Sequence, residues 1–290
     1  MTPEGNRLPP SPVSLPEAWA GREPWITSAL LCLTAVASWT WLLQGAGTGM
    51  DSWAMSVWRL PTGNGEQAGG GGWSLHYSLI MLAMWWVMMI AMMLPSASPM
   101  ILLYARVYRF NYPTHTDSTA SDQSAPATAI SLFTLGYLLM WLLFSIAAAS
   151  AHGLLEWAAI VHPMMMWINV PQLSALLLLI AGVYQLTPLK ESCLRHCQQP
   201  AQYLTSHWRR GRWGPLRMGL DHGLYCLGCC WALMLLLFVG GAMNLIWIVG
   251  LSVWVLLEKF SPRWPWVQRL SALALIIGGI LLWYQAAVIG

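Results

Sequence analysis

The chain has 290 residues, of which 57% are hydrophobic and only 9% are charged, and its formal net charge is +3. This composition, with repeated apolar runs long enough to cross a bilayer, excludes an ordinary water-soluble core and predicts a polytopic membrane protein. Most of the basic excess lies in one loop, so it does not indicate a nucleic-acid-binding surface. Five of the six cysteines lie between residues 193 and 230, which is too clustered for a disulfide scaffold.

In chain order, the polar and proline-rich residues 1–25 predict a disordered cytoplasmic tail, followed by a single transmembrane helical domain over residues 26–290. We expect an all-α bundle of about seven spans, because each apolar run is close to the roughly 20 residues that a helix needs to cross hydrocarbon. The mixed segment 151–170 is predicted to be one interfacial helix. The expected spans are 26–44, 77–104, 128–150, 172–189, 220–239, 242–258 and 269–288.

The orientation is predicted from the positions of lysine and arginine. The loop 190–217 carries six of these residues, whereas the stretch 45–76 carries only Arg59. Because basic loops are retained on the cytoplasmic side, we expect the loop 190–217 and the N-terminus to be cytoplasmic and the C-terminus to lie outside.

A cluster of cysteines begins the expected fifth helix. Cys229 and Cys230 follow Cys226 by three and four residues, which places all three on one helical face. His222 precedes Cys226 by four residues and extends this face by one turn.

A second group with the same spacing lies before the basic loop. Cys193, His196 and Cys197 share a face if the fourth helix continues through them. Both groups are expected near the cytoplasmic membrane face, where the ends of the two helices can meet. Thiolate and imidazole are soft donors that suit Cu(I) or Zn(II) better than the oxygen-preferring Ca²⁺ and Mg²⁺. The two groups therefore predict a copper site, with zinc as the alternative.

The expected second helix is rich in methionine, with seven of the 17 methionines between residues 81 and 100. Met84, Met88 and Met92 recur every four residues and so lie on one face of the helix. Thioether sulfur is a soft ligand that suits Cu(I), so this face can relay copper toward the cysteines. Adaptable apolar packing is the alternative role for methionine. Pro95 and Pro99 predict a break or a kink in the same helix.

Other polar residues in the apolar segments have two possible roles. We interpret Glu258, next to Lys259, as part of an ion pair at the membrane edge, with an approach to the cysteines as the alternative. His152, Glu156 and His162 lie near three consecutive methionines, and we interpret them as an interfacial anchor, with a site where metal enters as the alternative.

Three sequence motifs resemble a bacterial family described as predicted metal-binding integral membrane proteins. They are AMWWVMMIAMMLPSASPM, YQLTPLKESCLRHC and GLYCLGCCWALMLLLFVGGAMNLIWIVGLSVWVLLEK, and the resemblance covers roughly residues 77–285. It implies a multi-helix protein of the bacterial inner membrane. It also implies a metal site, which would lie at Cys193, His196, Cys197, Cys226, Cys229 and Cys230.

The motifs favour a binding protein over an enzyme. The sequence contains no phosphate-binding glycine loop followed by Lys-Ser/Thr, no serine-nucleophile motif and no HExxH pattern. We predict binding, transfer or transport of copper. One alternative is a membrane thiol-disulfide redox protein that uses Cys226 and Cys229, with Cys230 as the resolving thiol.

Another alternative is an accessory subunit that stabilises a larger membrane complex and holds a structural zinc ion. The expected partners are the lipid bilayer and a metallochaperone or other membrane-complex subunits, with no nucleic acid.

Overall fold

A computed structural model describes residues 23–49, 52–54, 56, 73–111, 126–261 and 265–289. Residues 1–22 of the predicted tail lie outside this described part, as do Arg59 and the glycine-rich stretch 69–72. The described residues form helices and connecting turns, with no strand among them, which confirms the predicted all-α class. The helices are α2 (Glu23–Leu43), α3 (Leu75–Asn111), α4 (Pro126–Trp157), α5 (Pro171–Gln185), α6 (Pro188–Gln198), α7 (Pro200–Ser206), α8 (Gly214–Leu235), α9 (Leu237–Gly240), α10 (Leu245–Phe260) and α11 (Pro265–Ile289).

Each of the seven expected apolar segments falls on helix, but fewer qualify as membrane spans. In the described chain, five helical segments are long and apolar enough to cross a membrane: α2, α3, α4, α8 continued by α9, and α11. A sixth is present if α5 and α6, which meet at 65°, form one broken span. α10 has 16 residues, so it is shorter than the roughly 20 residues that a straight span needs.

The helix predicted over 151–170 is not formed as a separate element. Residues up to Trp157 continue α4, and residues 158–170 form turns held by an isolated bridge between Val161 and Ile168. Ala159 and Met166 have φ angles of 56° and 54°, in the left-handed region that a right-handed helix cannot accommodate. The apolar side chains of residues 158–170 therefore pack from turns and not from a helix.

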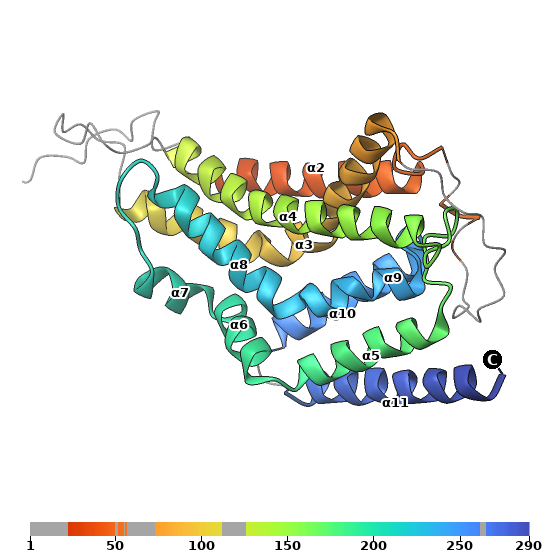
Figure 1. Ribbon diagram of the computed structural model, residues 1–290. Coiled ribbons are helices and arrows are strands. Elements are labelled where there is room, and N and C mark those ends of the chain that lie inside the picture. Colours follow the sequence, from red (N-terminus) through yellow and green to blue (C-terminus); the bar gives the residue numbers. More distant parts are fainter. Residues whose placement is uncertain are drawn as a thin grey trace, which may run out of the picture.

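The bundle is arranged around the contact between α4 and α8, which lie side by side (Figure 1). Their backbones approach closely at Gly136 and Gly219, where a Cβ atom would lie 2.3 Å from the Leu216 carbonyl oxygen and 2.0 Å from that of Phe133. Small residues at such crossings allow helices to pack in apolar surroundings. α5 and α11 form a pair along another side of the bundle. α6 and α7 lie at one end, and the connection after α4 lies at the other.

α3 is one continuous helix through Pro95 and Pro99, so of the two expectations the break is absent, and its ribbon bends along its course, as a kink requires (Figure 1). Proline removes a backbone donor, so Pro99 leaves the carbonyl of Pro95 without its helical partner. The Ser98 hydroxyl donates to that carbonyl at 2.8 Å, and the Ser96 hydroxyl donates to the Met93 carbonyl at 2.8 Å. The two serines thus support the backbone in the region that faces the cysteines.

α8 begins at Gly214, earlier than the expected start at residue 220. Pro215 stands in its first turn, where proline has the helical φ angle and its missing N–H costs no hydrogen bond. With a rise of about 1.5 Å per residue, Cys226 lies about 18 Å from the start of the helix. The cysteines are therefore deeper in the bundle than their predicted place at a helix end.

Candidate metal centre

The three cysteines of α8 are buried and face the same side of the helix. Cys226, Cys229 and Cys230 are each at most 2% exposed. The thiols of Cys229 and Cys230 donate to the Cys226 carbonyl oxygen at 3.1 and 2.7 Å, and the two sulfur atoms are 3.7 Å apart. The helical spacing predicted from the sequence therefore places these sulfur atoms together.

α6 brings a fourth thiol to this group. Thr187 caps the helix by accepting a hydrogen bond from the Lys190 N–H, and Pro188 follows it, so the chain turns between α5 and α6. As a result α6 packs against α8, and the Cys197 thiol interacts with the thiols of Cys226 and Cys229. Cys193 lies one turn earlier, where its sulfur packs against Gly228; a Cβ atom there would be 2.7 Å from it.

α3 contributes a thioether from outside the predicted row of Met84, Met88 and Met92. The Met93 sulfur lies 3.9 Å from the Cys230 sulfur. Met84, Met88 and Met92 are also fully buried along α3, but Met93 is the methionine with a sulfur–sulfur contact of this kind in the described structure. We call Cys197, Cys226, Cys229, Cys230 and Met93 the sulfur cluster.

A buried lysine and a tyrosine contact the sulfur cluster. Lys259 Nζ lies 3.0 Å from Cys226 Sγ and 2.8 Å from Ser96 Oγ. The Tyr137 hydroxyl lies 3.3 Å from Cys226 Sγ and donates to the Met93 carbonyl at 3.1 Å. The sequence offered no signal for Tyr137, and Lys259 was considered only as a neighbour of Glu258.

Glu258 forms an ion pair, as expected, but its partner is Lys190 and the pair is buried. Its carboxylate accepts from Lys190 Nζ at 2.6 Å, and both side chains are at most 4% exposed. Consecutive residues of an α-helix point about 100° apart. Glu258 therefore points toward α5, α6 and α11, while Lys259 points toward the cysteines.

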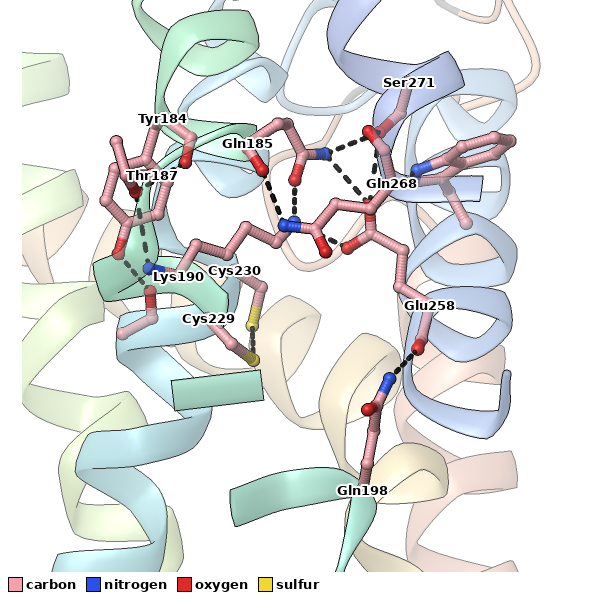
Figure 2. Close-up of polar contacts among 12 residues, drawn as sticks. Tyr184, Gln185, Thr187, Lys190, Gln198, Cys229, Cys230, Glu258, Gln268 and Ser271 are labelled. Atoms are coloured by element: carbon pink, nitrogen blue, oxygen red, sulfur yellow. Dashed lines mark hydrogen bonds and ion pairs between the residues drawn. The ribbon is translucent and has the colours of Figure 1, made fainter. Parts of the chain in front are cut away.

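Figure 2 shows the polar contacts around this buried pair, beside Cys229 and Cys230. Gln185 Nε2 donates to Glu258 Oε1 at 2.9 Å and to Ser271 Oγ at 3.0 Å, and Lys190 also donates to Gln185 Oε1. We call Gln185, Lys190, Glu258 and Ser271 the hinge network, because it joins the two sides of the α5–α6 bend to α10 and α11. The hinge network holds α6 in the position in which Cys197 contacts α8.

The two histidines of the predicted site lie in different surroundings. His222 is buried, and its ring stacks on Tyr137 and Phe133 with centroids 5.7 and 6.1 Å apart. Its Nδ1 has no hydrogen-bond partner within the described structure. His196 instead stacks on Tyr225, with ring centroids 4.2 Å apart, and its Nδ1 lies 2.8 Å from the Ser192 carbonyl oxygen. His222 thus lies beside the sulfur cluster, whereas His196 belongs to an aromatic group.

That aromatic group lies around α7 and the start of α8. Tyr203 lies edge-on to His196 and donates from its hydroxyl to the Met218 carbonyl at 3.3 Å. Burial, reinforced by the nearby Asp221 carboxylate, raises the pKa of the Tyr203 phenol well above its ordinary value. Tyr203 therefore stays protonated and keeps this bond at physiological pH.

The sulfur cluster has spacings that suit a soft metal ion. Two sulfur ligands at about 2.3 Å from one metal lie about 3.8 Å apart in a tetrahedral site. The observed sulfur–sulfur distances are 3.7 and 3.9 Å. In the described chain, however, no three His, Cys, Asp or Glu side chains are arranged as a finished metal site. The thiols instead hydrogen-bond to backbone and to one another.

Comparison with known proteins gave one match. The family model described as "PpoB2: Copper chaperone" matches residues 82–282, a range that includes the Met-rich part of α3, both cysteine groups and Lys259. No curated protein and no solved structure matches the chain.

Proposed function

The chain belongs to the PpoB2 copper chaperone family, and from this premise we propose that it is an integral membrane protein that binds Cu(I) in the sulfur cluster and passes it to a partner. The convergence of four thiols and one thioether from α3, α6 and α8 is the observation that carries the proposal. Thiolate and thioether are the ligands that favour Cu(I) over harder cations.

The surface of the bundle supports a place in the membrane. Leu33 and Val36 on α2, and Ile277 and Ile280 on α11, are each more than half exposed. Soluble proteins rarely expose apolar helix faces of this extent, whereas lipid covers them at no cost. In the bacterial inner membrane the α6–α7 end, followed by Arg209, would be cytoplasmic.

The charge of the site suits Cu(I). A Cu(I) ion held by two thiolates carries one negative charge, which the Lys259 ammonium group beside Cys226 neutralises. Unpaired buried charge is costly, so a single buried lysine matches a two-thiolate Cu(I) site. A zinc ion held by three thiolates carries the same charge, so metal analysis, and not charge, distinguishes the two metals.

Transfer can proceed by exchange of ligands along α6. The thiols of α8 are buried, whereas Cys193 and Cys197 on α6 are partly exposed. Copper held by α8 can therefore move to Cys197, then to Cys193, and leave to a soluble or membrane-bound acceptor. This order places the two partly exposed thiols after the buried ones.

The redox alternative has less physical support. The helix dipole lowers a thiol pKa only within the first turn of a helix. Cys226 and Cys229 lie well inside α8, which starts at Gly214. The CxxC pair therefore gains nothing from the helix dipole. Lys259, 3.0 Å from Cys226 Sγ, favours a thiolate, but both thiols are at most 2% exposed, whereas reactive dithiols are partly accessible.

The proposal is tested by metal analysis of protein purified without oxygen in detergent. We expect about one copper per chain in the sulfur cluster of the wild type. The Cys226→Ser/Cys229→Ser variant should lose it, and Cys32→Ser, which changes an exposed cysteine on α2, should keep it. X-ray absorption should show sulfur ligands. Zinc in place of copper, or equal copper in all three proteins, would contradict the proposal.

A further inference from the structure

A second group of buried polar atoms lies at the other end of the bundle from α6 and α7. His152 and Glu156 stand one turn apart near the C-terminal end of α4, and their exposed fractions are 0% and 6%. His152 Nε2 and Glu156 Oε2 are 4.0 Å apart, which is too far for a hydrogen bond. Neither atom has a hydrogen-bond partner in the described part of the chain.

The walls around these atoms are aromatic. The rings of Trp73, Trp85 and Phe238 have centroids 5.6, 6.2 and 5.8 Å from that of His152. Trp85 Nε1 donates to His152 Nδ1 at 3.3 Å. The neutral imidazole therefore carries its proton on Nε2, which faces a carboxylate that it does not reach. A buried polar atom without a partner costs about 1–3 kcal/mol, so two of them facing each other indicate a site for a bridging group.

The distance between the two atoms suits a metal ion. Metal bonds to imidazole nitrogen and to carboxylate oxygen are each about 2.0–2.2 Å long, so an ion between the two ligands spans about 4 Å when the angle is wide. Binding requires the ring proton to move to Nδ1 and the Trp85 N–H to turn away. The distance of 3.3 Å between Trp85 Nε1 and His152 Nδ1 is long for a hydrogen bond. This bond is therefore weak, and breaking it costs little free energy.

The same wall leads to sulfur ligands. Trp85 lies on α3, where Met81 precedes it by one turn and Met88 and Met89 follow it by one turn, all fully buried. Met92 and Met93 continue this row to the sulfur cluster, where Met93 contacts Cys230. Residues four apart along a helix rise by about 6 Å, a short step for an ion that exchanges one sulfur ligand for the next.

We propose that His152 and Glu156, completed by the thioether of Met81, Met88 or Met89, form a second metal site, which takes up Cu(I) and feeds the buried methionines of α3. The uptake role rests on the proposed function, but binding at His152 does not. Glu156 is close to the end of α4 at Trp157, which is exposed, so an ion reaches the carboxylate first and the imidazole next.

The test uses Ag(I), a redox-stable ion with the ligand preferences of Cu(I), and counts bound ions by equilibrium dialysis of the full chain in detergent. In a cysteine-free variant, with Cys32, Cys193, Cys197, Cys226, Cys229 and Cys230 all changed to Ser, about one Ag(I) should remain bound. His152→Gln in this background should remove it. His162→Gln, at a histidine that lies outside the site, should leave it bound. X-ray absorption of the remaining ion should show both nitrogen or oxygen and sulfur ligands.

Two results would overturn the second site. One is a folded cysteine-free variant that binds no Ag(I), which would mean that the gap between His152 and Glu156 holds only water. The other is bound Ag(I) that His152→Gln does not change. With all cysteines present, His152→Gln should lower the stoichiometry from about two to about one, which covers the case in which the cysteine-free variant does not fold. Failure of the proposed function would look different, because replacing all six cysteines would then remove no metal.

Discussion

Lys259 is a buried cation that faces sulfur. Its ammonium group lies 3.0 Å from Cys226 Sγ, and its other contact is the neutral hydroxyl of Ser96. In apolar surroundings a buried ammonium group needs a negative partner, and a metal-bound thiolate supplies one. The residue therefore has a specific electrostatic task in the proposed copper complex.

We predict that Lys259→Met lowers the affinity for Cu(I) by about 10–100-fold, the usual cost of removing a group that supports metal ligands. Methionine keeps the volume of the side chain and removes its charge. The measurement is competition with a Cu(I) chelator of known affinity. Arg269→Met, which removes an exposed cation from α11, is the matched control and should have no effect. Equal losses in the two variants would show that net charge matters and the position of Lys259 does not.

At the scale of elements, the crossing of α4 and α8 depends on the absence of side chains. A Cβ atom at Gly219 would lie 2.0 Å from the carbonyl oxygen of Phe133, which belongs to the backbone of α4 and cannot move alone. The crossing also positions Tyr137 of α4 against Cys226 of α8. The geometry of the sulfur cluster therefore depends on this helix pair.

We predict that Gly219→Ala destabilises the protein by about 1–3 kcal/mol or more, the cost of overpacking a tight contact. Gly250→Ala on α10 is the control, because no atom lies within 4 Å of the added Cβ. In a helix this second change should be neutral or stabilising by up to about 1 kcal/mol. Thermal unfolding in detergent, followed by circular dichroism, measures both. A Gly219→Ala variant as stable as Gly250→Ala would show that the two helices do not pack this closely.

At the scale of the whole molecule, the hinge network connects the helix that carries Cys197 to the far side of the bundle. Its members come from α5, α6, α10 and α11, and the buried pair of Lys190 and Glu258 lies in its centre. α6 carries Cys197 to the sulfur cluster only while this bend is held. Loss of the network should therefore affect both stability and copper binding.

We predict that Glu258→Gln destabilises the fold by about 3–5 kcal/mol, because it leaves the Lys190 ammonium group buried without a counter-charge. The matched control is Glu191→Gln on α6, the helix that carries Lys190. It breaks an ion pair with Arg195, and the side chains of Glu191 and Arg195 are 55% and 67% exposed. An exposed pair contributes about 0–1 kcal/mol, so this variant should be close to wild type. Unfolding free energies from denaturant titration test the difference. Similar values for the two variants would mean that Lys190 is not buried as described.

The uptake site and the sulfur cluster lie at different places along the same helix. Trp85 of α3 contacts His152, and Met93 contacts Cys230. With about 1.5 Å of rise per residue, the two contacts are about 12 Å apart along α3. An ion that moves from the proposed uptake site to the sulfur cluster needs ligands along this distance. The buried methionines of α3 between Trp85 and Met93 can supply them.

The amino-acid sequence by itself determined the helical class and the grouping of the cysteines. Long apolar runs have few alternatives to helix, because every backbone N–H and C=O must find a partner within its own segment. The three- and four-residue spacings placed Cys226, Cys229 and Cys230 on one face because helical periodicity is a local property. The residues that match the copper chaperone family, 82–282, include these cysteines.

Only the tertiary structure decided which residues meet. It selected Met93 over Met84, Met88 and Met92, directed Lys259 to the cysteines, and moved His196 away from them. It also made Lys190 the partner of Glu258, 68 residues away along the chain. The physical reason is that such contacts depend on the bend between α5 and α6 and on the approach of α4 to α8. Thr187 and Pro188 start α6 locally, but the direction in which α6 then runs, like the approach of α4 to α8, is set by packing between distant segments, which no local pattern encodes.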